Sequence, residues 1–251
     1  MDKIEFDTSE LAWITYKVFY GCNFKIKEKD RKYSELQIGN NNIQISGDTD
    51  FNFGPGWSNS IANKYERYLE EIPQEYKKVY QHQLSICKEL FYSIVNVSLM
   101  PRTGNLQNTK KGLGNDRLDT FIWALSSYYD RETSLLFNNA TFQNTTHLKE
   151  YFKLFINGKS DPIYNYCSYI YGISDGLVDD FIKSGKLAID SPERVIGYMR
   201  LAYRFWNHKL MRINEKMNNS KDLLSPAEQM KMSNEIERVT KALSSWFDET
   251  E

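Results

Sequence analysis

The chain has 251 residues, of which 41% are hydrophobic, 26% are charged and 14% are aromatic. This composition is typical of a folded globular protein and excludes an intrinsically disordered chain. The formal net charge of −1 at pH 7 excludes a surface that is basic throughout. Binding of nucleic acid or of an anionic membrane would therefore need a local cluster of cations.

The N-terminal sequence and the cysteines predict a cytoplasmic protein. Residues 1–7 are acidic and lack the basic-then-apolar pattern of a secretion signal. No apolar run approaches the roughly 18 residues that span a bilayer, so we expect no membrane partner. Cys22, Cys87 and Cys167 are few and far apart, which predicts buried thiols in a reducing compartment.

Residues 1–60 predict a small mixed region of short strands and loops that packs on a larger body. The apolar stretch 11–20 and the alternating piece 43–45, set among glycines and asparagines, carry this prediction. Segment 48–57 combines turn residues with aromatics and marks the end of the region. A serine after it is placed to cap the first long helix.

Apolar residues at helical spacing predict a helical body over residues 61–190. Two consecutive helices are separated by Pro73. Residues 94–100 are β-branched and alternating, and fit either a helix end or a strand. Three further helices are expected, at 118–125, from Leu148 to Gly158, and from Ser174 or Asp175 to Gly185.

Residues 191–251 predict an antiparallel helical hairpin. Pro192 and Pro226 each follow a serine, and proline at the first helical position loses no hydrogen bond. Glu228 stands three residues after Ser225, as in a capping box. The expected fold class is thus mainly α (α+β), with a helical body, a small mixed N-terminal region and a C-terminal hairpin.

One loop, residues 101–116, is unusually basic. From Arg102 to Asn115 it holds three cations, three glycines and no acid, so its backbone can approach an anion such as a phosphate. The alternative is a structurally packed loop, in which Asp116 and Asp119 only complement the dipole of the following helix. The candidate ligand-binding cations here are Arg102, Lys110, Lys111 and Arg117.

Short motifs on both sides of this loop occur in a recognisable order. They are Gly47-Asp48-Thr49-Asp50, Glu71-Ile72-Pro73, Pro101 with a Gly-Asn-Leu step, Asp116-Arg117-Leu118-Asp119 and Tyr128-Tyr129. Over roughly residues 40–170 the chain resembles an uncharacterised bacterial family known only as a domain of unknown function, which implies no activity. In size and AT-rich residue usage it also resembles the AbiB-like abortive-infection proteins of lactic acid bacteria, which implies phage defence.

A second basic stretch lies in the helix expected over 192–217. Basic residues recur at every fourth position along the face beside the apolar stripe of this helix. With aromatic neighbours they can contact phosphates and stack on bases. The alternative is charge pairing with the acidic last helix. The residues of this basic face are Arg200, Arg204, His208 and Arg212.

Two enzymatic hypotheses come from local motifs. Arg204 and His208 are the candidate catalytic residues, because they are similar to the Arg–His motif of helical bacterial ribonucleases, although fewer residues intervene here. The segment 172–176 matches the Gly-x-Ser-x-Gly nucleophile elbow, but its helical surroundings favour Ser174 as a helix cap. The three histidines lack metal-ligand spacing, so we expect no bound metal and no cofactor.

Two functions from different classes fit these features. The first is binding of nucleic acid or a phosphate ligand in a phage-defence or mobile-element setting, through the two basic stretches. The second is a non-enzymatic interaction module that forms a homo-oligomer through the C-terminal hairpin. Whether the protein is an enzyme stays open.

Overall fold

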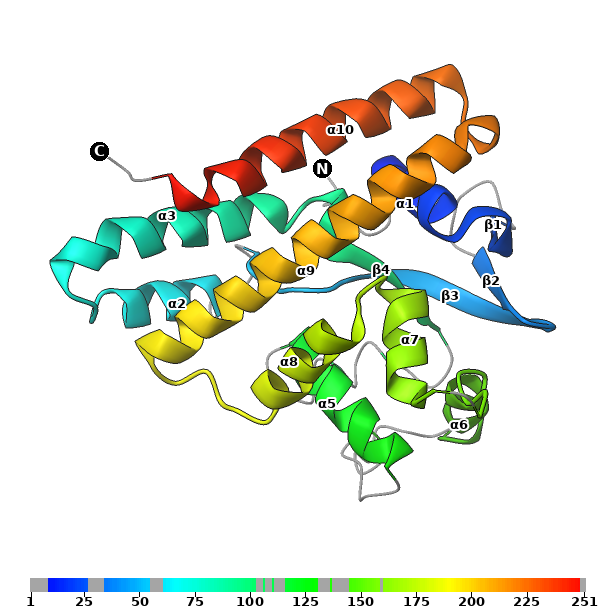
Figure 1. Ribbon diagram of the computed structural model, residues 1–251, viewed down its shortest axis with the longest axis horizontal. Helices are drawn as coiled ribbons and strands as arrows, with labels where there is room; N and C mark the ends of the chain where they lie inside the picture. Colours follow the sequence, from blue (N-terminus) through cyan, green and yellow to red (C-terminus); the bar gives the residue numbers. More distant parts are fainter. Residues whose placement is uncertain are drawn as a thin grey trace, which may run out of the picture.

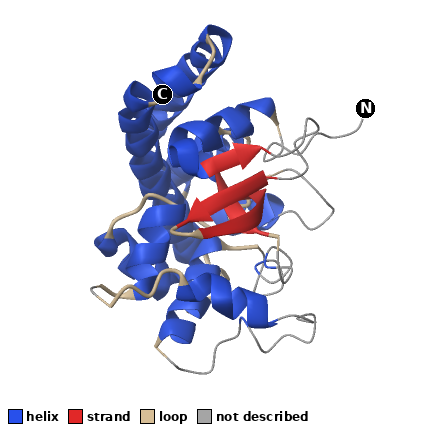
Figure 2. Cartoon of the chain, turned by 90° about the vertical axis from the view of Figure 1, so that its right-hand side faces the viewer, coloured by secondary structure: helices blue, strands red, loops and turns tan. Residues whose placement is uncertain are grey.

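The fold combines many helices with one small sheet (Figures 1 and 2). The computed structural model describes residues 9–26, 34–54, 61–102, 106, 110, 116–130, 136, 145–158 and 160–248. Within these residues the only sheet has four antiparallel strands in the order β1-β2-β3-β4. The mainly α (α+β) class predicted from the sequence is confirmed.

The sheet is built from three consecutive strands and a fourth that joins later in the chain. Gly39, with a φ of 58°, opens the two-residue turn between the second and third strands, a conformation that glycine adopts without strain. Residues 94–96 form a short 3-10 turn and the fourth strand follows, so both alternatives for this segment occur in succession. The strands are β1 (Phe24–Ile26), β2 (Ser34–Ile38), β3 (Asn41–Thr49) and β4 (Val97–Pro101).

Residues 10–20 form a helix, α1 (Glu10–Tyr20), where strands and loops were expected. This part of the prediction was wrong. β-Branched and aromatic residues favour strands, but α1 is covered on nearly all sides by α9, α10 and β4. A helix that is apolar all round is stable when neighbours bury every face. The Ser9 side chain caps it by accepting from the Ala12 N–H at 3.2 Å.

The helices of the body follow the predicted spacing, but α6 ends at Lys153 and not at Gly158 as predicted, and one further helix was not expected. The unexpected helix is α7, which Asp161 caps and Pro162 begins. Helix α8 ends at Gly185, as the sequence predicts. The helices are α2 (Ile61–Leu69), α3 (Gln74–Leu90), α5 (Leu118–Tyr129), α6 (Thr145–Lys153), α7 (Pro162–Ile170) and α8 (Asp175–Gly185).

The predicted C-terminal hairpin consists of α9 (Pro192–Asn219) and α10 (Pro226–Ser244). The capping box of Ser225 and Glu228 is present. Figure 1 shows α9 running diagonally through the molecule, and it packs against α1, α2, α3, α8 and α10. The hairpin therefore belongs to the same core as the rest of the chain.

The centre of this core is aromatic. Phe51, which follows β3, contacts the rings of Tyr198, Phe205 and Trp206 on α9. Trp206 also donates its indole N–H to the Asn96 side chain at 3.1 Å. Among the described helices, none combines the length and the apolar character needed to cross a membrane.

Candidate functional site

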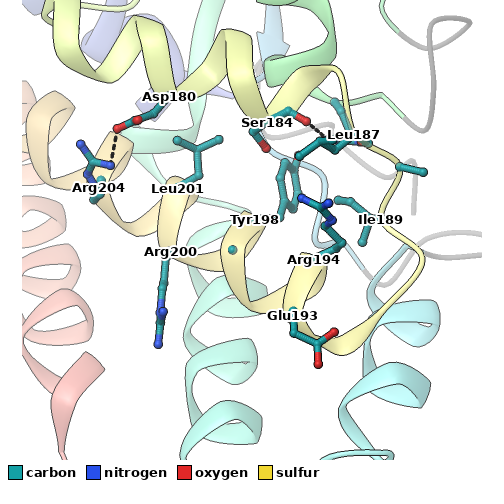
Figure 3. Close-up of a pocket in the computed structure, with 13 residues that line it drawn as sticks. Asp180, Ser184, Leu187, Ile189, Glu193, Arg194, Tyr198, Arg200, Leu201 and Arg204 are labelled. Atoms are coloured by element: carbon teal, nitrogen blue, oxygen red, sulfur yellow. Dashed lines mark hydrogen bonds and ion pairs between the residues drawn. The ribbon is translucent and has the colours of Figure 1, made fainter.

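A pocket of about 280 Å³ lies between the first turns of α9, the end of α8 and residues 187–189 (Figure 3). Its lining includes two acids, Asp180 and Glu193, and four arginines. Three of these arginines are candidate site residues from the sequence. The structure thus brings the end of the basic loop and the basic helix to one place. The arginines are Arg117, Arg194, Arg200 and Arg204.

Arg117 is only 5% exposed and forms the inner wall of the pocket. Its Nε and Nη2 donate to the two Asp119 carboxylate oxygens at 3.0 and 2.6 Å, and Nη1 donates to the Leu187 carbonyl at 2.8 Å. Burial disfavours its charged form, but Asp119 outweighs this effect and raises the Arg117 pKa. Arg117 therefore ties residue 187 to α5, in contrast to the ligand-binding role expected from the sequence.

The other three arginines lie on the accessible side of α9. Arg204 Nη1 donates to Asp180 on α8 at 2.5 Å. Figure 3 shows Arg200 pointing away from α8. Neither Arg194 nor Arg200 forms an ion pair with the residues that the structure describes. These two guanidinium groups are available to an anion from outside.

The acid nearest to these arginines is oriented by its own helix end. Glu193 accepts a hydrogen bond from the Ser191 hydroxyl at 2.8 Å. This bond, together with backbone N–H groups and the neighbouring Arg194, lowers the Glu193 pKa. In Figure 3 the carboxylate points away from α8. Glu193 and Arg200 therefore extend in the same direction from α9, away from the pocket wall that α8 forms.

Gly197 lies between Arg194 and Arg200 on the pocket surface. Glycine inside a helix costs about 0.5–1 kcal/mol relative to alanine. A Cβ at this position would meet no atom within 4 Å, so packing does not require glycine here. At Gly185, in contrast, a Cβ would lie 2.2 Å from the Asp119 carbonyl oxygen. Because Gly197 has no side chain, the surface of α9 between Arg194 and Arg200 is not covered at this position.

Lys110, a second candidate from the basic loop, is fully buried. Its Nζ lies 2.5 Å from Asp48 Oδ2 and 3.4 Å from Asp116 Oδ1, and donates to the Thr49 carbonyl. Burial raises the pKa of Asp48 to about 7, although Lys110 acts in the opposite direction. An external phosphate would have to displace two carboxylates, so the structure does not offer Lys110 as a ligand-binding cation.

A second buried ion pair lies beside the first, and the sequence analysis missed it. Lys209 Nζ donates to Asp50 Oδ2 at 2.7 Å and to Ser98 Oγ at 2.6 Å, and also to the Val97 carbonyl. Burial lowers the Lys209 pKa, while Asp50 favours the charged form. The available signal was a lysine within the apolar stripe of α9, because an isolated cation there needs a buried partner.

Two of the motifs quoted for the resemblance, those of Asp48 and Asp116, meet beside β3 at Lys110. Asp48 and Asp50 pair with lysines from the loop and from α9, and Arg117 pairs with Asp119 at the start of α5. In the sequence Lys110 lies 62 residues from Asp48, and Lys209 lies 159 residues from Asp50. We interpret these three ion pairs as structural, because each buried charge has a partner of opposite sign. No His, Cys, Asp and Glu side chains of the described residues form a group that could hold a metal ion.

The remaining candidates lie outside the pocket. Arg102 is exposed, and its backbone N–H donates to Gln44 beside the sheet at 3.0 Å. Lys111 lies outside the described residues. His208 is half-buried on α9, one turn beyond Arg204, and does not line the pocket. The structure therefore does not place the two candidate catalytic residues in one cavity.

Charge pairing between α9 and α10 does not occur among the described residues. Arg204 pairs with α8, and Arg212 pairs with Glu215 of its own helix at 2.9 Å. The acids of α10 pair elsewhere, Glu228 with α1 and Glu235 within α10. The alternative explanation for the basic face, an acidic partner helix in the hairpin, is wrong for these residues.

Two other expectations are settled by the surroundings of the residues concerned. Ser174 precedes α8, which follows α7 and not a strand, and the sheet is antiparallel. A nucleophile elbow needs a parallel strand before it, so this motif match does not describe such a site. Cys87 and Cys167 are buried as expected, whereas Cys22 is exposed.

Comparisons with known proteins do not identify a relative of this chain. No family model, no curated protein and no solved structure matches the chain. The case for function therefore depends on the pocket geometry alone.

Proposed function

We propose that the protein binds the phosphate groups of nucleic acid in the arginine-lined pocket of α9. The observation that carries the proposal is the surface formed by Arg194, Gly197 and Arg200. Arg194 and Arg200 flank Gly197, above which there is open space. Neither guanidinium group has an ion-pair partner among the described residues. Guanidinium groups donate in a planar fork that matches phosphate oxygens.

Two further features favour an anion at this place. The first turn of α9, which carries Glu193 and Arg194, borders the pocket, and the helix dipole is positive there. Arg204 adds a third guanidinium, which Asp180 holds in position. The chain as a whole carries a net charge of −1, so attraction of a polyanion has to come from such a local surface.

The test is binding of single-stranded RNA and DNA oligonucleotides by wild type and by the double variant Arg194→Ala/Arg200→Ala. Each lost phosphate contact reduces the slope of log affinity against log salt concentration by about 0.7 for a single strand. We expect the double variant to bind at least tenfold more weakly at low salt and to show a smaller slope. Fluorescence anisotropy at four or more salt concentrations measures both quantities.

A control with the same change in net charge is Lys231→Ala/Lys241→Ala, two exposed positions on α10. It should bind as wild type does. Equal affinities of wild type, double variant and control, or no binding at low ionic strength, would contradict the proposal. The setting, phage defence or a mobile element, stays a prediction that this experiment does not address.

The second candidate function, a homo-oligomer formed by the hairpin, has less support. The apolar residues of α10 face its own chain, with Met232, Val239 and Leu243 buried against neighbouring helices. The stripe expected to join two copies is thus already covered.

A further inference from the structure

A second cavity, of about 410 Å³, lies at the other end of α9, between α1, β2, α7 and the residues that follow α6. No carboxylate is among the described residues that line it. Two cations, three asparagines and aromatic rings make up most of its wall. Its cations, Arg212 and Lys216, lie one helical turn apart on α9. Like charges at this spacing disfavour each other, and a bound anion would relieve the repulsion.

Lys216 is fixed at the cavity by contacts with α1. Its Nζ donates to the Phe19 carbonyl and lies 4.7 Å from the centroid of the Phe19 ring. An ammonium group has three donors, and this carbonyl takes one of them. Burial and the neighbouring Arg212 lower the Lys216 pKa, while Glu215 acts in the opposite direction. Glu215 pairs with Arg212 on the outer side of the helix.

The opposite wall offers groups that recognise a planar polar ring. Tyr169 is half-buried, and its hydroxyl is held by donation to the Gln37 carbonyl at 3.0 Å. Asn165 donates to the Phe155 carbonyl at 2.9 Å and accepts from the Ser160 hydroxyl at 2.6 Å, so the orientation of its amide is fixed and one further donor and acceptor position of the amide remain. Asparagine side chains pair with base edges, and tyrosine rings stack on bases. Ser168, exposed on α7, adds a hydroxyl at the rim.

We propose that this cavity binds one nucleotide, with the base between Tyr169 and the asparagines and the phosphate at Arg212 and Lys216. The volume and the mixture of aromatic, amide and cationic groups fit this ligand class. The nucleotide could come from two sources, a free mononucleotide or one residue of a strand. The site shares no lining residue with the arginine-lined pocket, so the two proposals can fail separately.

The test is calorimetric titration of the full chain with AMP, UMP, adenosine, inorganic phosphate and a five-nucleotide RNA. We expect AMP or UMP to bind at one site, and adenosine and phosphate each to bind at least tenfold more weakly. Arg212→Ala should weaken nucleotide binding at least tenfold, and Ser168→Trp, which fills the rim, should abolish it. Lys241→Ala, a charge-matched control at an exposed position of α10 outside both pockets, should leave AMP binding unchanged.

Thermal unfolding of each variant shows whether it is folded. Tighter binding of AMP than of the RNA assigns a free nucleotide. Tighter binding of the RNA, blocked by Ser168→Trp, assigns a strand. Binding of neither AMP nor UMP at millimolar concentration, or binding that folded Ser168→Trp retains, would overturn the inference. Oligonucleotide binding that depends on Arg194 and Arg200 but not on Ser168 would overturn it and leave the proposed function intact.

Discussion

At the scale of single residues, burial decides what each charge can do. Lys110 and Arg117 were grouped from the sequence with Arg200 as ligand-binding cations, but both are buried and paired with aspartates. Arg200 is exposed. Local sequence predicts that a lysine is charged, yet it does not say which aspartate reaches it from 62 residues away. The same uncertainty applies to Lys209 and Asp50.

The raised pKa of Asp48 predicts a pH-dependent stability. This carboxyl has a pKa of about 7 in the folded chain and about 3.9 when unfolded. Between these values the folded state holds a proton that the unfolded state has lost, so stability contributed by Asp48 falls as pH rises. We expect the difference in unfolding free energy between wild type and Asp48→Asn to decrease on the order of 1 kcal/mol per pH unit from pH 5 to 7. Urea unfolding across this range measures it, and parallel pH profiles would refute it.

Two glycines on neighbouring helices should respond to alanine in opposite directions. Gly185→Ala places a methyl group against the backbone of Asp119, so we expect a loss of about 1–3 kcal/mol. Gly197→Ala meets open space in the middle of α9, and we expect a gain of about 0.5–1 kcal/mol. Chemical denaturation of both variants provides the measurement. A gain at Gly185 would show that α5 and α8 are not packed as described.

At the scale of elements, the helix starts are the most predictable feature. The side chain of Ser225 accepts from the Glu228 N–H, and Glu228 reaches back to the Ser225 N–H at 2.9 Å. We expect Ser225→Ala to cost about 1 kcal/mol. The matched control is Ser174→Ala, because Ser174 begins α8 without a side-chain capping bond and should change stability by less than about 0.5 kcal/mol. Thermal unfolding compares the two, and equal losses would contradict the assignment.

Helices α1 and α7 show where prediction from local pattern stops. The residues of α1 are apolar almost throughout, so no helical or strand period stands out, and only their burial by α9, α10 and β4 decides for the helix. Helix α7 has a cap at Asp161 and a proline at 162. These are ordinary signals of a helix start, and α7 could have been predicted from them. The cavity beside Tyr169, in contrast, is lined by residues from segments that are far apart in the sequence, so no local sequence pattern predicts it.

At the scale of the whole molecule, the buried ion pair of Lys209 and Asp50 connects α9 to the end of β3. Removing one partner leaves an uncompensated buried charge. We therefore expect Lys209→Met to lower the free energy of unfolding by about 3–5 kcal/mol, because Asp50 stays buried without a cation. The double variant Lys209→Met/Asp50→Asn should lose less than the sum of the single losses, because the residues contact each other directly. Denaturant unfolding of the four proteins in the cycle tests this coupling. Additive losses would show that the pair does not interact.

Helix α9 lies late in the chain, yet α1, α2, α3 and α8 all pack against it. A ribosome releases α1, α2 and α3 long before residues 192–219 emerge. Until then Phe51 and its neighbours lack the aromatic rings of α9 that surround them in the finished protein. Nascent chains should consequently stay protease-sensitive through most of synthesis and become resistant abruptly once this helix has left the exit tunnel.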